Sequence, residues 1–122
     1  MNHHGPLPIN SGGVCGGSAT AFNLITAAST HVVPGDIVVL AGDFNARAGS
    51  ETIRQLRQSL RHVATGAKQG GIDNIFTNLG AASIVSTANH DGAGSDHDAL
   101  GAVLEPHGPA GGAASGAWPP PF

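Results

Sequence analysis

The sequence of 122 residues predicts an α/β domain in which a mixed sheet is flanked by two helices. An unbroken apolar run of strand length lies at 36–44. Segments with helical spacing of apolar residues precede and follow it, at 18–31 and 50–63. Shorter strand-like segments then continue to residue 104.

The first predicted helix runs from Ser18 to His31. Ser18 is a suitable N-cap, and Pro34 with Gly35 ends the segment. Apolar residues recur within it at near-helical spacing, at Ala19, Phe22, Leu24, Ile25 and Ala28. The run Asp36–Phe44 follows, and its β-branched and apolar residues predict a central strand that is buried on both faces.

The second predicted helix covers Ser50–Val63. Ser50 opens it, and one side of it is apolar, with Ile53, Leu56 and Leu60. The simplest interpretation of the three arginines on the other side is a solvated face: Arg54, Arg57 and Arg61. His62 would lie near the C-terminus of this helix.

Three short strands are predicted after the second helix. Two of them, 72–77 and 82–87, follow a Gly-rich break and predict a hairpin. A polar loop at 89–96 then leads to a last strand at 99–104.

The two ends are expected to lie outside the folded domain, which we place at 18–105. Residues 1–17 are rich in Gly, Pro, Asn and Ser and predict a disordered segment or the remnant of an earlier one. Residues 106–122 form a low-complexity Gly/Ala/Pro tail that is expected to be disordered.

Composition excludes several classes of function. A net charge of −3 with five Lys plus Arg offers no broad basic surface, so any contact with a phosphate must be local. A single cysteine excludes an internal disulfide framework and zinc sites built on paired thiolates. No apolar run approaches the roughly 20 residues of a membrane span, and the start lacks the pattern of a signal peptide. The default expectation is therefore an intracellular chain.

Three of the eight carboxylates stand where apolar runs begin or stop: Asp43, Asp73 and Asp96. Strand ends are where α/β proteins place reactive groups. Clustered carboxylates repel one another unless a cation or a histidine offsets their charge. Oxygen ligands of this kind suit Mg²⁺, which takes one or two carboxylates together with substrate phosphate oxygens.

Two further side chains complete the candidate site. Asn45 lies two residues after Asp43, so on an extended segment both side chains would point to the same side. His97 is flanked by acids in DHD, and a histidine oriented by a carboxylate is a common general acid or base.

Each segment alone also has a plain structural interpretation. GDFN suits a strand that ends in a turn, IDNIF an amphipathic strand, and SDHD an Asx-type turn. Their joint occurrence in this order is harder to explain in that way.

GDFN at 42–45, IDNIF at 72–76 and GSDHDAL at 94–100 resemble the three C-terminal motifs of the endonuclease/exonuclease/phosphatase superfamily, the DNase I-like fold. The resemblance spans about residues 36–105. It implies the C-terminal half of a four-layer α/β sandwich. It also implies a metal-dependent phosphoester hydrolase.

The resemblance implies a role for each candidate residue. Asp43 would orient the attacking water, and Asn45 would contact the scissile phosphate and help fix that aspartate. His97, held by Asp73, would act as the base or as a partner of the transition state. Asp96 would lie at the metal, which is expected to be Mg²⁺ or Mn²⁺.

The chain also departs from the family pattern. The family's N-terminal half supplies an Asn and a Glu to the metal, and neither has a counterpart here, so the expected metal site is incomplete. The only glutamates, Glu51 and Glu105, lie in another context. His3 or His4 is either the remnant of a further family histidine or inert. Smaller departures are Asn74, where an aromatic is common, and Ala99, where Pro is common.

Two main hypotheses about function follow. The first is a hydrolase that acts on a phosphoester substrate, either nucleic acid or a smaller phosphorylated molecule. The alternative is a catalytically inactive, truncated half-domain with a scaffold role or none; an unrelated acidic metal-binding module is a remoter third. Because one sheet alone would expose an apolar face, self-association or pairing with a missing N-terminal half is expected.

Overall fold

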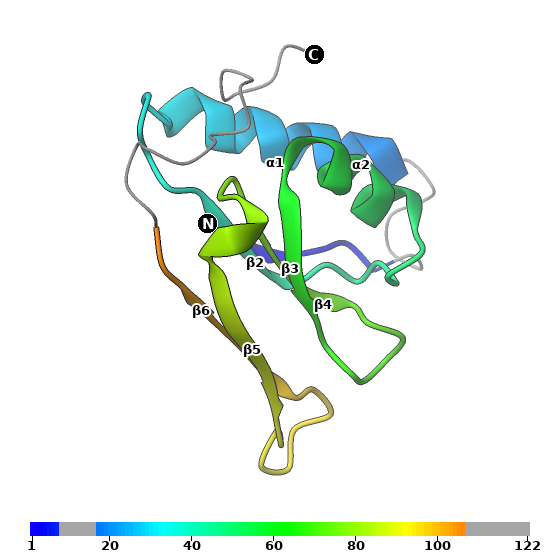
Figure 1. Cartoon of the computed structure of the whole chain (residues 1–122). Helices are drawn as coiled ribbons and strands as arrows, with labels where there is room; N and C mark the ends of the chain where they lie inside the picture. The colour runs from blue at the N-terminus through cyan, green and yellow to red at the C-terminus, as the bar shows by residue number, and fades with distance from the viewer. Residues whose placement is uncertain (8–16, 107–122) are drawn as a thin grey trace.

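The computed structural model describes residues 1–7 and 17–106. Helices and strands alternate from β1 to β3, and the rest of the chain is mainly strands (Figure 1). In chain order they are β1 (Asn2–His4), α1 (Gly17–His31), β2 (Val39–Asp43), α2 (Glu51–Ser59), β3 (Arg61–Thr65), β4 (Asp73–Thr77), the 3₁₀ helix η1 (Ala81–Ser83), β5 (Ile84–His90) and β6 (Ala99–Leu104). Of the end segments 1–17 and 106–122, which were predicted to lie outside the folded domain, the parts at 8–16 and 107–122 lie outside the described residues.

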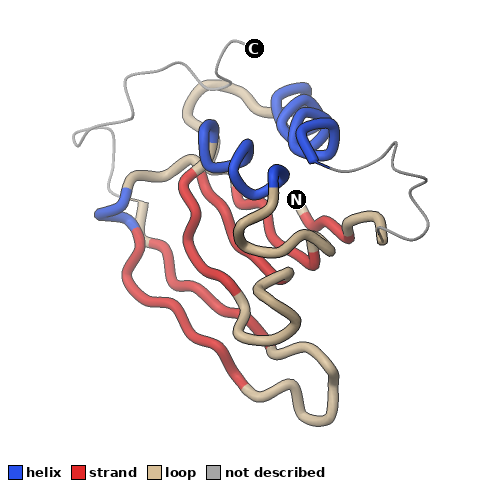
Figure 2. Tube along the Cα trace, turned by 90° about the vertical axis from the view of Figure 1, so that its right-hand side faces the viewer, coloured by secondary structure: helices blue, strands red, loops and turns tan. Residues whose placement is uncertain are grey.

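A mixed sheet of four strands forms the centre of the structure, in the order β1-β2-β4-β3. β1 runs parallel to β2, whereas β4 pairs antiparallel with both β2 and β3. Both α1 and α2 lie on the same side of this sheet (Figure 2). The remaining strands, β5 and β6, form a separate two-stranded antiparallel sheet that extends away from the helices (Figure 1). The predicted mixed sheet with two helices is confirmed.

Three predictions about individual elements are wrong. The second helix ends at Ser59 rather than at residue 63, because Leu60 is already extended and 61–65 pair with β4 as β3. The expected hairpin of 72–77 with 82–87 does not form, since β4 pairs with β2 and β3 while β5 pairs with β6. Residues 2–4, expected in a loop or remnant, form β1.

Gly42 allows β1 to lie against β2. Its φ is +146°, and a Cβ at this position would be 1.9 Å from the carbonyl oxygen of His3. A side chain would therefore clash with the neighbouring strand, and only glycine fits. The glycine of GDFN thus has a packing role in this fold.

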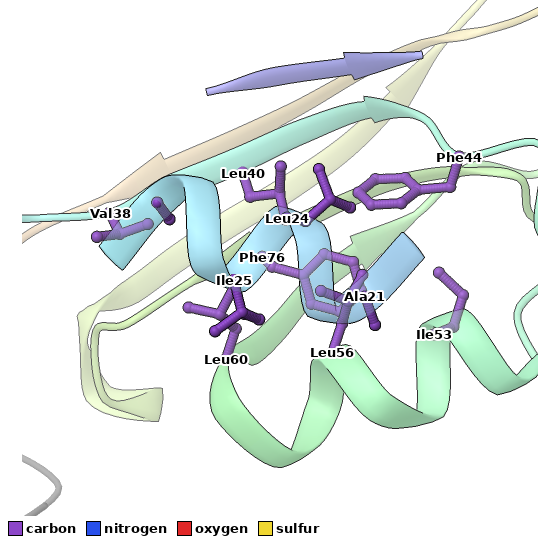
Figure 3. Close-up of a cluster of buried hydrophobic side chains, with 11 residues drawn as sticks. Ala21, Leu24, Ile25, Val38, Leu40, Phe44, Ile53, Leu56, Leu60 and Phe76 are labelled. Atoms are coloured by element: carbon purple, nitrogen blue, oxygen red, sulfur yellow. The ribbon is translucent and has the colours of Figure 1, made fainter. Parts of the chain in front are cut away.

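The hydrophobic core fills the space between the sheet and the two helices (Figure 3). Leu40 and Phe76 are cross-strand partners on the helix side of the sheet, and the ring of Phe76 meets that of Phe44 edge-on at 5.5 Å. The helices contribute their apolar sides, with Ala21, Leu24, Ile25, Ala28, Ile53 and Leu56. No residue of β5 or β6 belongs to this core cluster.

In the described residues, neither helix has the length and apolar character that crossing a lipid bilayer would require.

The core position of Ile53 gives a test of this packing. The side chain is fully buried, so Ile53→Val removes a buried methyl and should lower the free energy of unfolding by about 1 kcal/mol. Val33→Ala removes more apolar volume at a side chain that is 60% exposed, and it should change stability by less than about 0.5 kcal/mol. Urea unfolding followed by circular dichroism measures both. Equal losses would contradict the assigned core.

Candidate functional site

Asp43 and Asp73 are direct cross-strand partners at one end of the β2–β4 pair. Side chains alternate along a strand, and Leu40 and Phe76 face the helices, so both aspartates lie on the opposite face of the sheet. Like charges placed directly opposite each other destabilise a pair of strands. These two carboxylates therefore need a compensating group.

His97 supplies part of that compensation. Its Nδ1 lies 2.8 Å from Oδ2 of Asp73, and its Nε2 lies 3.9 Å from Oδ2 of Asp43. Since an ionised carboxylate only accepts hydrogen bonds, Nδ1 donates to Asp73 and Nε2 is directed toward Asp43. The hydrogen bond to Asp73 raises the pKa of His97, and the charges of Asp73, Asp43 and Asp96 add to this effect.

Asn45 fixes the Asp43 carboxylate through its backbone. Its N–H donates to Oδ1 of Asp43 at 2.7 Å, while its side-chain amide donates to the carbonyl of Gly5 at 2.8 Å. Asn45 has φ +47°, so the chain is not extended at this point and the expected alternation of side chains does not apply. The predicted proximity of Asn45 to Asp43 therefore arises from a turn.

The two N-terminal histidines have different environments. Nε2 of His4 lies 3.7 Å from Oδ2 of Asp43, because β1 places His4 beside that aspartate. The ring of His3 instead packs against Phe44 at 5.0 Å, and burial lowers its pKa. Of the two, His4 is the one that adjoins the candidate site.

Asp96, the predicted metal ligand, is exposed beside His97. It is not in the group of three side chains whose possible ligand atoms lie within 4.8 Å of one another, namely Asp43, Asp73 and His97. Its Oδ2 accepts a hydrogen bond from the amide of Gln69 at 3.2 Å. The structure thus brings Asp43, Asp73 and His97 together and leaves Asp96 at the rim.

Gln69 was not predicted from the sequence. It lies in the loop between β3 and β4, and its amide contacts both Asp96 and Nε2 of His97. The neighbouring Lys68 forms an ion pair with Asp98 at 2.7 Å. The Gly70–Gly71 pair in the sequence marks a tight turn here, but it does not indicate that the preceding side chain reaches the site.

A polar network that includes one fully buried residue, Asn74, adjoins the same loop. His62 is in β3, not at the end of a helix as predicted, and its Nε2 contacts Oδ1 of Asn74 at 2.9 Å. Nδ1 of His62 accepts from the guanidinium of Arg57 at 2.8 Å, and burial is the main cause of its lowered pKa. Asn74, fully buried, also donates to the carbonyl of Gly71 at 3.0 Å. Its polar side chain therefore holds the end of the loop.

Comparisons with known proteins give no assignment for this site. No protein-family model, no curated protein and no solved structure matches the chain. The site is therefore described by its own geometry. Two carboxylates are paired across a sheet. One nitrogen of an imidazole is hydrogen-bonded to the first carboxylate, and the other nitrogen is directed toward the second carboxylate.

This arrangement can move a proton and can hold a cation. The ring of His97 is fixed at Nδ1, so Nε2 is the atom that can exchange a proton with a bound molecule. Two carboxylates and an imidazole also offer ligand atoms to a divalent metal ion.

The bond between Asp73 and His97 gives a test of this geometry. Asp73→Asn removes the negative charge at Nδ1 of His97 and should lower the pKa of that histidine, as measured by an NMR titration of its imidazole resonances. Asp36→Asn is a matched control, since Asp36 contacts the backbone of Val33 in another part of the structure. An unchanged pKa for His97 in Asp73→Asn would contradict the assigned contact.

Proposed function

We propose that the chain carries part of a metal-dependent phosphoester hydrolase site of the endonuclease/exonuclease/phosphatase type. The observation that supports this most is the convergence of Asp43, Asp73 and His97, which are far apart in the sequence. Each comes from one of the three segments GDFN, IDNIF and GSDHD. A chance likeness of three short segments would not require them to meet at one place.

In this proposal His97 is the proton-transfer group. Asp73 holds the ring through Nδ1 and stabilises its protonated form, which leaves Nε2 to exchange a proton with the substrate or with water. Asp43 lies on the Nε2 side, with Oδ1 held by the backbone of Asn45 and Oδ2 toward the two histidines His97 and His4. Oδ2 of Asp43 is thus positioned to accept a hydrogen bond from an attacking water.

The donor set fits Mg²⁺ or Mn²⁺. Asp43 and Asp73 are close, and Asp96 adds a third negative charge near His97, whereas the nearby cation Lys68 is paired with Asp98. A divalent ion held by these carboxylates would offset their repulsion, and when bound it would supply charge stabilisation for a phosphoryl group. Three candidate ligand residues in the described part of the chain are few for a divalent ion, which agrees with the expectation of an incomplete metal site.

The DNase I-like fold remains part of the proposal. The β5–β6 pair contributes nothing to the core, and Val85 and Val103 on it are 53% and 52% exposed. In a four-layer sandwich β5 and β6 would be part of a second sheet. The other strands of that sheet would come from an N-terminal half or from another copy of the chain. The same observation supports the alternative, an inactive half-domain, which activity measurements distinguish.

The hydrolase proposal predicts metal-dependent turnover that depends on the site residues. With Mg²⁺ or Mn²⁺ the parent chain should hydrolyse a chromogenic phosphodiester or nick supercoiled plasmid. His97→Ala and Asp43→Ala should each reduce the rate by about 10²–10⁴-fold, the usual contribution of a proton-transfer group. His31→Ala is the matched control, because His31 is exposed at the end of α1.

Two results would reject the hydrolase. One is the absence of turnover in the folded parent chain with either metal ion. The other is equal turnover in the parent, His97→Ala and Asp43→Ala, which would show a contaminating activity. Either result would favour the inactive half-domain.

A further inference from the structure

The loop between β3 and β4 holds an uncommon backbone conformation at its tip. Gln69 has φ +52°, and Gly70 and Gly71 follow with φ +76° and +78°. A left-handed conformation is uncommon for a residue with a side chain and persists where surrounding contacts hold it. The backbone of Gln69 is therefore fixed by its surroundings.

Contacts on both sides of Gln69 hold the loop. On one side Lys68 forms the ion pair with Asp98, and its carbonyl accepts from the N–H of Gly71 at 3.0 Å. On the other side the buried amide of Asn74 donates to the carbonyl of Gly71 at 3.0 Å. The carbonyl of Gly70 also accepts from the N–H of Ala48 at 3.3 Å. The Gln69 side chain thus projects from an anchored turn.

The amide of Gln69 lies against the atom of His97 that the proposed reaction uses. Its Nε2 is 3.2 Å from Nε2 of His97, 3.2 Å from Oδ2 of Asp96 and 3.4 Å from the carbonyl oxygen of Asp96. In the neutral ring Nδ1 of His97 donates to Asp73, so Nε2 is then the acceptor for this amide. A substrate group that approaches Nε2 of His97 must come within reach of Gln69.

The uncharged side-chain amide of Gln69 is a suitable hydrogen-bond donor for a site surrounded by carboxylates. The surrounding charges are negative, from Asp43, Asp73 and Asp96, and they repel the oxygens of a phosphodiester. An uncharged carboxamide can donate to such an oxygen without forming an ion pair with the carboxylates beside it. Lys68, the cation next to it in the sequence, is held by Asp98.

We propose that Gln69 is a substrate-contacting residue that exchanges its hydrogen bond with Nε2 of His97 for one with a non-bridging oxygen of a phosphodiester. The inference rests on the proposed function, because it names the group of the substrate that this site recognises. No covalent step is involved.

Dimethyl phosphate, the smallest phosphodiester, is a suitable probe in the presence of Mg²⁺. On adding it to the ¹⁵N-labelled full chain, the side-chain NH₂ resonances of Gln69 should shift. The dissociation constant from this titration, followed at the backbone amide of His97, should rise about tenfold in Gln69→Ala, because a hydrogen bond to a charged group is lost. Gln69→Asn, whose amide is one methylene shorter, should also weaken binding. Gln58→Ala on the exposed side of α2 should leave it unchanged.

The outcomes separate this inference from the hydrolase proposal. The inference is overturned if dimethyl phosphate does not bind, if the Gln69 resonances stay in place, or if Gln69→Ala binds as tightly as the parent. Turnover by the parent with an unchanged KM in Gln69→Ala also overturns it and leaves the hydrolase standing. Binding through Gln69 without turnover upholds the contact and rejects the hydrolase.

Discussion

The candidate site depends on the placement of two carboxylates directly opposite each other across β2 and β4. Asp43 and Asp73 occupy paired positions at the end of these strands, on the face away from the helices. The repulsion between these two carboxylates destabilises the strand pair, and a positive charge bound at the site would reduce it. His97 offsets part of the negative charge through its hydrogen bond to Asp73. The backbone N–H of Asn45 and the ring of His4 surround the second carboxylate.

The sequence predicted those parts of the fold whose signals are local. The helix over 18–31 and the strand over 99–104 agree with α1 and β6 nearly residue for residue, because apolar spacing and the stop at Pro34 and Gly35 mark the helix and an apolar run marks the strand. The expected N-cap, Ser18, instead lies inside α1, which begins at Gly17. β3 was missed because the arginine spacing of the second helix continues past its real end at Ser59. β1 was missed because it contains no apolar pattern and depends on pairing with a strand nearly forty residues away.

Site residues could be predicted only where residue type and position carry a chemical signal. Acids at strand ends, and a histidine between acids, identified Asp43, Asp73 and His97. Nothing in the sequence distinguishes His4 from His3; the parallel pairing of β1 with β2 does so. Gln69 has an ordinary side chain, and its contact with His97 depends on a left-handed turn in the loop between β3 and β4. The role of buried Asn74 likewise could not be predicted, because it depends on the hydrogen bond to the carbonyl of Gly71 at the end of the loop.

Paramagnetic line broadening by Mn²⁺ in the NMR spectrum of the ¹⁵N-labelled chain tests most directly whether Asp43, Asp73 and His97 form one cation-binding and proton-transfer site. At low Mn²⁺ the amide signals of these three residues and of Asp96 should be lost selectively. The double variant Asp43→Asn with Asp73→Asn should abolish that loss. Broadening centred on another part of the chain, or the same broadening in the double variant, would show that these residues do not form a cation site.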